Sequence, residues 1–199
     1  MQATYFKLGV LLKIFGAWVI SPILTMIMAF CFYLALGRFF RGRSMMRWSR
    51  TLAVAVVLSA AYVSYSLGAN DVGNAIGPLL SKFPDKGPWL ALLGGLAMAV
   101  GAWSFGSRVT DTVGKSITPL DYSGALAAQL SAAVGVHVFS MAGIPVSTSQ
   151  AVVGGVIGVG LTKGVRAVSV RKISTIFLGW VVTPVCAAIF AALVYRLVA

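Results

Sequence analysis

The chain has 199 residues, of which 59% are hydrophobic and only 10% are charged, whereas soluble domains carry about 25% charged residues. It contains 16 lysines and arginines, four acidic residues and one histidine, which gives a net charge of +12. This composition excludes an ordinary soluble enzyme and a disordered tail. A nucleic-acid-binding domain is also excluded, because the cations lie in short patches between long uncharged runs and not on one solvated face. The composition is typical of an integral membrane protein.

Five apolar segments are long enough, or nearly so, to cross the hydrocarbon core, which needs roughly 20 helical residues. They are residues 8–36, 51–81, 89–105, 124–161 and 173–194. The first is interrupted at Ser21-Pro22 and the fourth at Gly143-Ile144-Pro145. No segment alternates as a lipid-facing strand would. We therefore predict an all-α integral membrane protein with about five membrane-crossing units, including broken helices or a hairpin.

Basic residues are unevenly distributed among the loops. They concentrate in 37–51, 106–123 and 162–172, whereas 82–88 holds two lysines offset by Asp85. Because cytoplasmic loops are enriched in Lys and Arg, the first three regions are predicted to be cytoplasmic. Both chain ends then lie on the opposite side of the membrane, and we expect a multi-pass protein of the cell membrane.

The first and last apolar segments share an internal repeat at an offset of 162 residues. Residues 14–22 read IFGAWVISP and residues 176–184 read IFLGWVVTP, and further on Ala29 matches Ala191 and Tyr33 matches Tyr195. The predicted directions of the two copies across the membrane are opposite, which is typical of inverted-repeat secondary transporters. Residues 1–50 are then the closing helix of a preceding, missing repeat plus a basic cytoplasmic loop, and residues 51–199 form one complete repeat.

The second apolar segment contains a polar motif, GANDVGNAIGPL, at residues 68–79. A carboxylate such as Asp71 costs about 2.5–3.5 kcal/mol at the bilayer centre, unless it faces a polar cavity or a cation. Asn70 and Asn74 are four residues apart, so one helix face should carry both. Carboxylate and amide oxygens suit Na⁺, and the carboxylate could instead accept a proton. The alternative is a helix end at the interface, with Asn70-Asp71 as a cap.

A second polar motif, PVSTSQ at residues 145–150, opens an apolar stretch that ends at Leu161. The 15 residues from Ser147 span about 22 Å as a helix, which is short for a full crossing. The motif therefore predicts a half-helix or hairpin arm whose N-terminus lies inside the protein, where free N–H groups and hydroxyls form an anion site. The alternative is that the hydroxyls simply cap a membrane helix.

The arm that leads into this motif offers Gln129 as the best polar candidate to face the site. His137 is more often a satisfied buried histidine than a proton relay. Gly154 and Gly158 form a small-residue face of the kind used in helix packing. Cys31 and Cys186 lie in apolar runs, and we expect buried thiols there.

Three motifs resemble those of the inorganic phosphate transporter (PiT) family, in the order and spacing of its C-terminal half. They are GANDVGNAIGPL at 68–79, WSFGSRVTDTVGKSITPLDYSGALAAQ at 103–129 and PVSTSQAVVGGVIGVGL at 145–161. The resemblance implies a secondary transporter that couples phosphate uptake to Na⁺ or H⁺. It also implies two inverted repeats that each supply one copy of the signature.

The resemblance implies separate residues for the cation and the anion. The cation would be bound by Asn70, Asp71 and Gln129, with Asp71 as the Na⁺ ligand if the coupling ion is sodium. Phosphate would be bound by Asn74, Ser147 and Thr148. Gln129 stands where many members have Glu, and Gln150 where many have His, so the cation coupling of this chain could differ.

The leading hypothesis is a half-transporter that is active only with a complementary half or as a homodimer. One alternative is a permease for another tetrahedral oxyanion, such as sulfate, and another is a non-transporting membrane subunit or a fragment. An enzyme is not expected, because the sequence shows neither a Ser-His-Asp order nor a metal-binding cluster. Apart from the coupling ion, no cofactor is expected.

Overall fold

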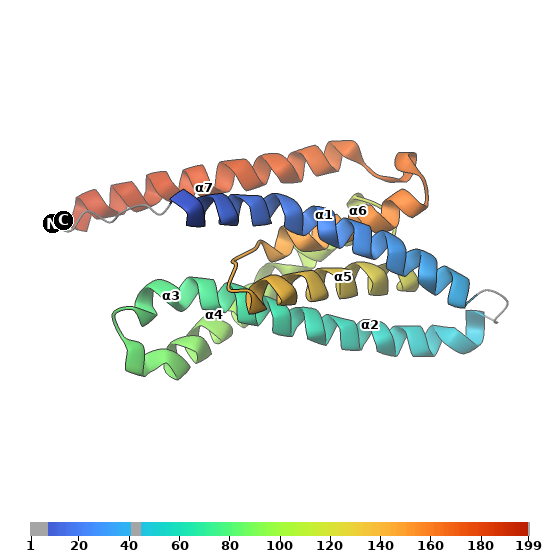
Figure 1. The fold of residues 1–199 in the computed structure, drawn as a ribbon, viewed down its shortest axis with the longest axis horizontal. Helices are drawn as coiled ribbons and strands as arrows, with labels where there is room; N and C mark the ends of the chain where they lie inside the picture. The colour runs from blue at the N-terminus through green and yellow to red at the C-terminus, as the bar shows by residue number, and fades with distance from the viewer. Residues whose placement is uncertain (1–7, 41–44, 199) are drawn as a thin grey trace.

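The computed structural model describes residues 8–40 and 45–198, and within them it contains helices, turns and loops but no strand. Seven α-helices follow one another along the chain (Figure 1). They are α1 (Leu8–Phe39), α2 (Met45–Leu67), α3 (Gly73–Leu80), α4 (Gly87–Asp111), α5 (Tyr122–Met141), α6 (Thr148–Thr162) and α7 (Val170–Val198). Two π-helical turns, η1 (Gly68–Val72) and η3 (Thr112–Ser116), and two 3₁₀ turns, η2 (Pro84–Lys86) and η4 (Val165–Ala167), lie between them.

Five stretches of helix are long and apolar enough to cross a membrane. They are Leu8–Phe39, Ser49–Leu80, Pro84–Gly114, Tyr122–Met141 and Val170–Arg196. The prediction of an all-α, multi-pass membrane protein is confirmed. The third stretch extends past the predicted 89–105 at both ends, and it includes Arg108 in the last turn of α4.

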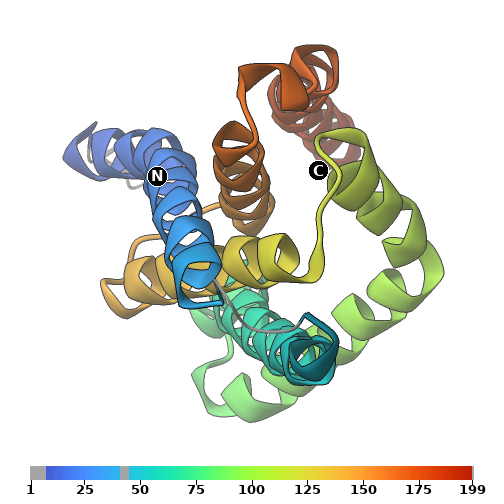
Figure 2. The same cartoon turned by 90° about the vertical axis from the view of Figure 1, so that its right-hand side faces the viewer.

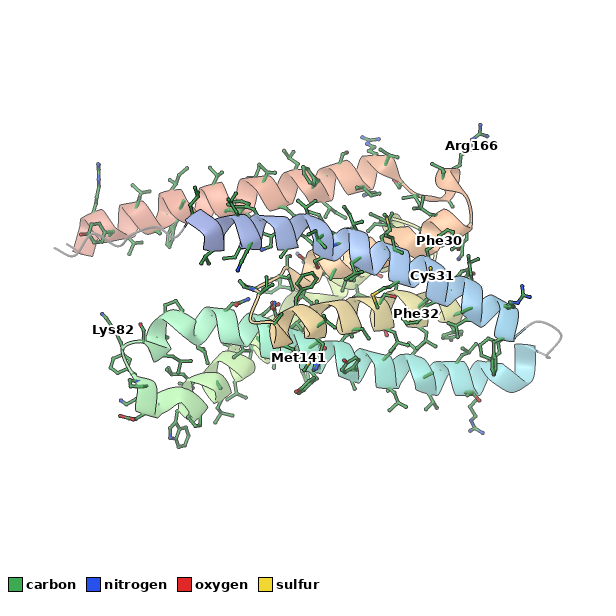
Figure 3. All side chains as sticks on the ribbon, in the orientation of Figure 1. Phe30, Cys31, Phe32, Lys82, Met141 and Arg166 are labelled. Carbon is green, nitrogen blue, oxygen red and sulfur yellow. The ribbon has the colours of Figure 1, made fainter. Side chains whose placement is uncertain are left out.

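The fourth apolar segment folds into a helical hairpin that ends inside the molecule. The 20 residues of α5 and the 15 residues of α6 are joined by a turn in which Gly143 has a φ of 67°. In Figure 3, Met141 at the end of α5 lies about midway along the long axis, between Lys82 at one end and Arg166 at the other. The break predicted at Gly143-Ile144-Pro145 is therefore the tip of a re-entrant hairpin.

The two ends of the molecule differ as the loop charges predict. Figure 1 shows the start of α1, the end of α7 and the η2 turn at one end of the long axis. The end of α1, the start of α2 and the η4 turn lie at the other end. Residues 117–121 join this second end, because the amide of Ser169 donates to the Ile117 carbonyl and the Lys163 ammonium donates to the Pro119 carbonyl.

We expect cysteine labelling to report this arrangement directly. In a chain without Cys31 and Cys186, cysteines placed at Arg38 and Arg166 should react with an impermeant maleimide from the cytoplasmic side only. A cysteine at Pro84 should react from the opposite side only. Labelling of positions 38 and 84 from the same side would contradict the topology.

The centre of the structure is formed by α1, α2, α5 and α6. Figure 2 shows α5 crossing between α2 on one side and α1 and α6 on the other. The closest approach is between α1 and α6. A Cβ atom added to Gly154 would overlap the Pro22 carbonyl oxygen, and one added to Gly158 would overlap the Met26 carbonyl oxygen. The packing role predicted for Gly154 and Gly158 is confirmed, with α1 as the partner.

The outer helices present apolar side chains to their surroundings. In α4 and in the second half of α7 the side chains are almost all exposed, as suits helices that face lipid or another membrane helix. Cys31 and Cys186 are exposed as well, so the expectation that both thiols are buried is wrong. The physical reason is that in a membrane protein an apolar run can face lipid, and an apolar sequence context does not imply burial.

The two copies of the internal repeat have similar local geometry. Phe15 and Trp18 meet edge to face with ring centroids 5.4 Å apart, and Phe177 and Trp180 do the same at 6.2 Å. Both helices contain a proline, Pro22 in α1 and Pro184 in α7, and the two helices run in opposite directions (Figure 1).

Candidate functional site

The first polar motif lies where α2 changes into a π-helical turn. This turn covers Gly68–Val72, and it leaves Asn70 buried and Asp71 half-buried. Single π turns inside α-helices are rare and are frequent at functional sites. The turn directs the Asn70-Asp71 pair towards the tip of the α5–α6 hairpin.

Asn70 ties the π turn to the backbone of the hairpin tip. Its side-chain Nδ2 donates to the Val146 carbonyl at 2.8 Å, and its Oδ1 lies 3.5 Å from both the Ser140 hydroxyl and the Val146 amide. A buried amide needs such partners, because an unpaired polar group away from water is costly. Asn70 therefore fixes the position of the loop from which α6 begins.

Asp71 faces the N-terminus of α6. Its Oδ1 accepts from the Thr148 hydroxyl at 3.1 Å and from the neighbouring Asn70 side chain. Ser147 occupies the N-cap position, where its hydroxyl accepts from the Gln150 amide at 3.4 Å. The N–H groups of the first helical turn have no intrahelical acceptor, so this helix end carries partial positive charge beside a carboxylate.

A cavity of about 800 Å³ opens beside this contact. Its polar lining includes Asp71, Ser147 and Thr148, together with Gln129 of α5. Gln129 is held by α2, since its Oε1 accepts from the Ser59 hydroxyl at 2.6 Å. The volume falls within the range of small-molecule sites, about 300–1,000 Å³.

The cavity extends from the polar motifs to the last turn of α4. Among the described residues that line it, Asp71 is the only acidic residue and Arg108 the only basic one. Ile176 and Trp180 of α7 complete the apolar wall. One carboxylate and one guanidinium thus line the same, largely apolar cavity.

The structure brings most of the predicted site residues together. Asn70, Asp71 and Thr148 are hydrogen-bonded to one another in sequence, and Gln129 and Ser147 line the same cavity as Asp71. Asn74 is exposed and is not part of the lining. Asn70, four residues earlier, is instead buried, and its side chain donates to the Val146 carbonyl.

Sequence reasoning missed two contributors to this site. Ser59 positions Gln129, and Arg108 lines the cavity, although the sequence analysis placed residue 108 only in a basic region predicted to be cytoplasmic. A usable signal existed for Ser59. Ser59 lies 7 residues before Ser66 and 11 residues before Asn70, and all three residues are buried. This spacing places their polar groups on one face of α2 and of the η1 turn that continues it.

His137 lies outside the cavity lining and contacts aromatic rings. Its imidazole is 5.8 Å from the Tyr62 ring and 5.9 Å from the Tyr65 ring, measured between centroids. These contacts join α5 to α2. They favour the structural interpretation of His137 over a proton relay.

The sequence profile of the phosphate transporter family matches residues 42–191 of the chain. A putative phosphate permease of Methanocaldococcus jannaschii, MJ0630, is 34% identical over 191 residues, which cover 94% of this chain and 62% of the relative. A putative phosphate permease of Pyrococcus horikoshii, PH0640, is 40% identical over 70% of this chain and 37% of its own length. The human sodium-dependent phosphate transporter 1 is 38% identical over 69% of this chain and 22% of its own length.

A solved structure of a sodium-dependent phosphate transporter shares the fold, with a TM-score of 0.70 and 24% identity. The alignment covers 86% of this chain and 62% of that one. The chain therefore spans less than two thirds of the length of these relatives.

Proposed function

The chain belongs to the phosphate transporter family, and from this membership together with the site we propose that it acts as one half of a cation-coupled phosphate transporter. The observation that carries the proposal is the pairing of Asp71 with the N-terminus of α6 in one cavity. One partner can hold a cation and the other can hold an anion. The two substrates of a symporter would then meet in the same chamber.

We assign phosphate binding to the start of α6. Helix N-termini bind phosphate through free N–H groups and the positive end of the helix dipole. Ser147 and Thr148 add hydroxyls at this point, and both line the cavity. Asn74 is exposed, and we leave it outside the proposed phosphate site.

We assign cation binding to Asp71, with Gln129 in the same cavity as a second oxygen ligand and Asn70 as the residue that orients Asp71. The carboxylate is a strong ligand for Na⁺ and equally a proton acceptor. The buried Oε1 of Gln150 has no hydrogen-bond partner among the described residues, and it offers a further oxygen close to the start of α6. Relatives named as sodium-dependent transporters favour Na⁺ over H⁺.

This geometry suggests why transport of the two ions would be coupled. With no cation bound, the Asp71 carboxylate occupies the positive end of α6 and repels a phosphate approaching the same place. A Na⁺ ion or a proton on Asp71 removes that repulsion. Phosphate affinity therefore rises when the cation is bound, and by linkage cation affinity rises with phosphate.

We further propose that residues 51–199 form one repeat and that residues 1–50 close a preceding one. The internal repeat in α1 and α7 and the partial coverage of the relatives support this division. The remaining part of the transport site would come from a complementary half or from a second copy of the chain.

Substitution of the two hydroxyls tests the anion site. We expect Thr148→Ala to weaken phosphate binding by about ten- to a hundredfold, because a hydrogen bond to a charged group is worth about 1.5–3 kcal/mol. Ser147→Ala should weaken binding and also cost about 1 kcal/mol of stability, because Ser147 caps α6. Phosphate titration and thermal unfolding should be measured on each variant.

Thr162→Ala is the matched control, since Thr162 ends the same helix and its hydroxyl donates to the Val159 carbonyl. It should leave phosphate affinity unchanged. If Ser147→Ala and Thr148→Ala lower stability but leave phosphate affinity intact, the hydroxyls are caps and the anion binds elsewhere. Sulfate in place of phosphate in the same titration separates a phosphate site from a general oxyanion site.

A further inference from the structure

One face of α1 consists of small residues, and this face packs into the centre of the molecule. The residues recur every four positions and are each at most 4% exposed: Ala17, Ser21, Thr25 and Ala29. Next to them, the backbone carbonyls of Pro22 and Met26 occupy the space that side chains at Gly154 and Gly158 would need. The small residues of α1 and the glycines of α6 thus allow the two backbones to approach closely.

The last helix carries the same face, but there it is exposed. The offset of the internal repeat places Gly179, Thr183, Ala187 and Ala191 at the corresponding positions of α7. All four are exposed. The face continues from an existing contact, because Ile176 and Trp180, on the same side of α7, pack against the core of this chain.

The direction of α7 determines the direction of the helix that would cover this face. Figure 1 shows α1 and α6 running the same way along the long axis and α7 running the opposite way. A helix that packs on α7 as α6 packs on α1 must therefore run antiparallel to α6. The protein that carries this helix would therefore be inserted in the membrane in the orientation opposite to that of the present chain.

A second copy of this chain does not meet that requirement. Its basic loops would orient it in the same way as the first copy. In addition, Gly154 and Gly158 of the second copy are already covered by its own α1. Both arguments point to a different half, with an inverted orientation and an uncovered glycine face.

We propose that the Gly179, Thr183, Ala187 and Ala191 face of α7 is a docking surface for a membrane helix with two glycines four residues apart. This helix belongs to a complementary transporter half of inverted orientation. The inference rests on the proposed function, and it names the partner that completes the transporter. Pro184 and Ala188 of α7 take the places that Pro22 and Met26 occupy at the α1–α6 contact.

Thiol reactivity tests this surface with a defined probe. The probe is a synthetic peptide with the α6 sequence, Thr148–Thr162, extended by leucines to the roughly 20 apolar residues that a crossing needs and flanked by lysines at both ends. It has no α1 to cover its glycines. The full chain is reconstituted with a single cysteine in place of both native ones, either Ala187→Cys on the docking face or Ile189→Cys on the opposite face of α7, whose counterpart in α1 is the exposed Ile27. The measured quantity is the rate of reaction with a membrane-soluble maleimide.

We expect the peptide to slow the reaction of the Ala187→Cys variant by roughly tenfold, and to leave the reaction of the Ile189→Cys variant nearly unchanged. A peptide with both Gly154→Leu and Gly158→Leu should give no protection. An unchanged rate for the Ala187→Cys variant, or equal protection at both positions, would overturn the docking surface. Protection of this variant that rises with the concentration of the chain alone would show that a second copy is the occupant and would overturn the proposed partner.

The assay involves neither phosphate nor a gradient. Failure of the docking surface would therefore leave the phosphate-binding measurements on Ser147 and Thr148 untouched. If Ser147 and Thr148 turn out not to bind phosphate, the reactivity of the Ala187→Cys variant still tests the docking surface.

Discussion

Replacing Asp71 by asparagine should abolish cation-driven phosphate uptake by the assembled transporter, while insertion and abundance stay nearly unchanged. Asparagine keeps the shape of the side chain, and its Oδ1 can still accept from the Thr148 hydroxyl. The substitution removes the only acidic group among the described residues that line the cavity. Uptake of radiolabelled phosphate under an imposed gradient, with abundance measured in the same membranes, tests this expectation.

Asp85→Asn is the matched control, because Asp85 is exposed in the η2 turn and lies outside the cavity. It should leave uptake unchanged. Normal gradient-driven uptake by the Asp71→Asn transporter would refute the role of the carboxylate in coupling. Loss of the protein from the membrane would instead show that Asp71 mainly stabilises the N-terminus of α6.

Gly158→Ala should markedly destabilise the folded chain. The added Cβ would overlap the Met26 carbonyl oxygen, which is backbone and cannot move aside as a side chain would. The helices α1 and α6 must then separate, and overpacking of this kind costs about 1–3 kcal/mol. Thermal unfolding of the purified chain measures the loss as a lowered midpoint.

Gly101→Ala provides the comparison, because a Cβ at Gly101 in α4 meets nothing within 4 Å. Alanine is favoured over glycine in helix interiors by about 1 kcal/mol, so this variant should be neutral or slightly more stable. Equal midpoints for Gly158→Ala and Gly101→Ala would contradict the close approach of α1 and α6.

The membrane spans and the re-entrant hairpin could be predicted from the sequence because they depend on local quantities. The length of an apolar run determines whether a helix can span the bilayer. The proline and glycine at 143–145, followed by an arm of only 15 residues, indicated the hairpin. The Gly154 and Gly158 pattern likewise indicated a packing face, although its partner α1 lies far away in the sequence.

The π turn and its consequences could not be predicted, because they depend on contacts between distant segments. Asn70 is held by the Val146 carbonyl, 76 residues away. That contact buries Asn70, whereas Asn74 is exposed. The same holds for Gln129, whose orientation depends on Ser59 across the helix pair. The exposure of Cys31 and Cys186 reflects the lipid surroundings, which an apolar sequence pattern does not distinguish from a protein core.

Gradient-driven transport tests the central claim most directly. The assembly that contains this chain, isolated from its own membrane through a tag on the chain, is reconstituted into proteoliposomes with radiolabelled phosphate outside. We expect phosphate to accumulate above its external concentration under an inward Na⁺ or H⁺ gradient, and an excess of unlabelled phosphate, but not of sulfate, to suppress the accumulation. Two results would contradict the assignment of this chain to a cation-coupled phosphate transporter. One is phosphate accumulation that does not depend on either gradient, and the other is suppression by unlabelled sulfate as strong as the suppression by unlabelled phosphate.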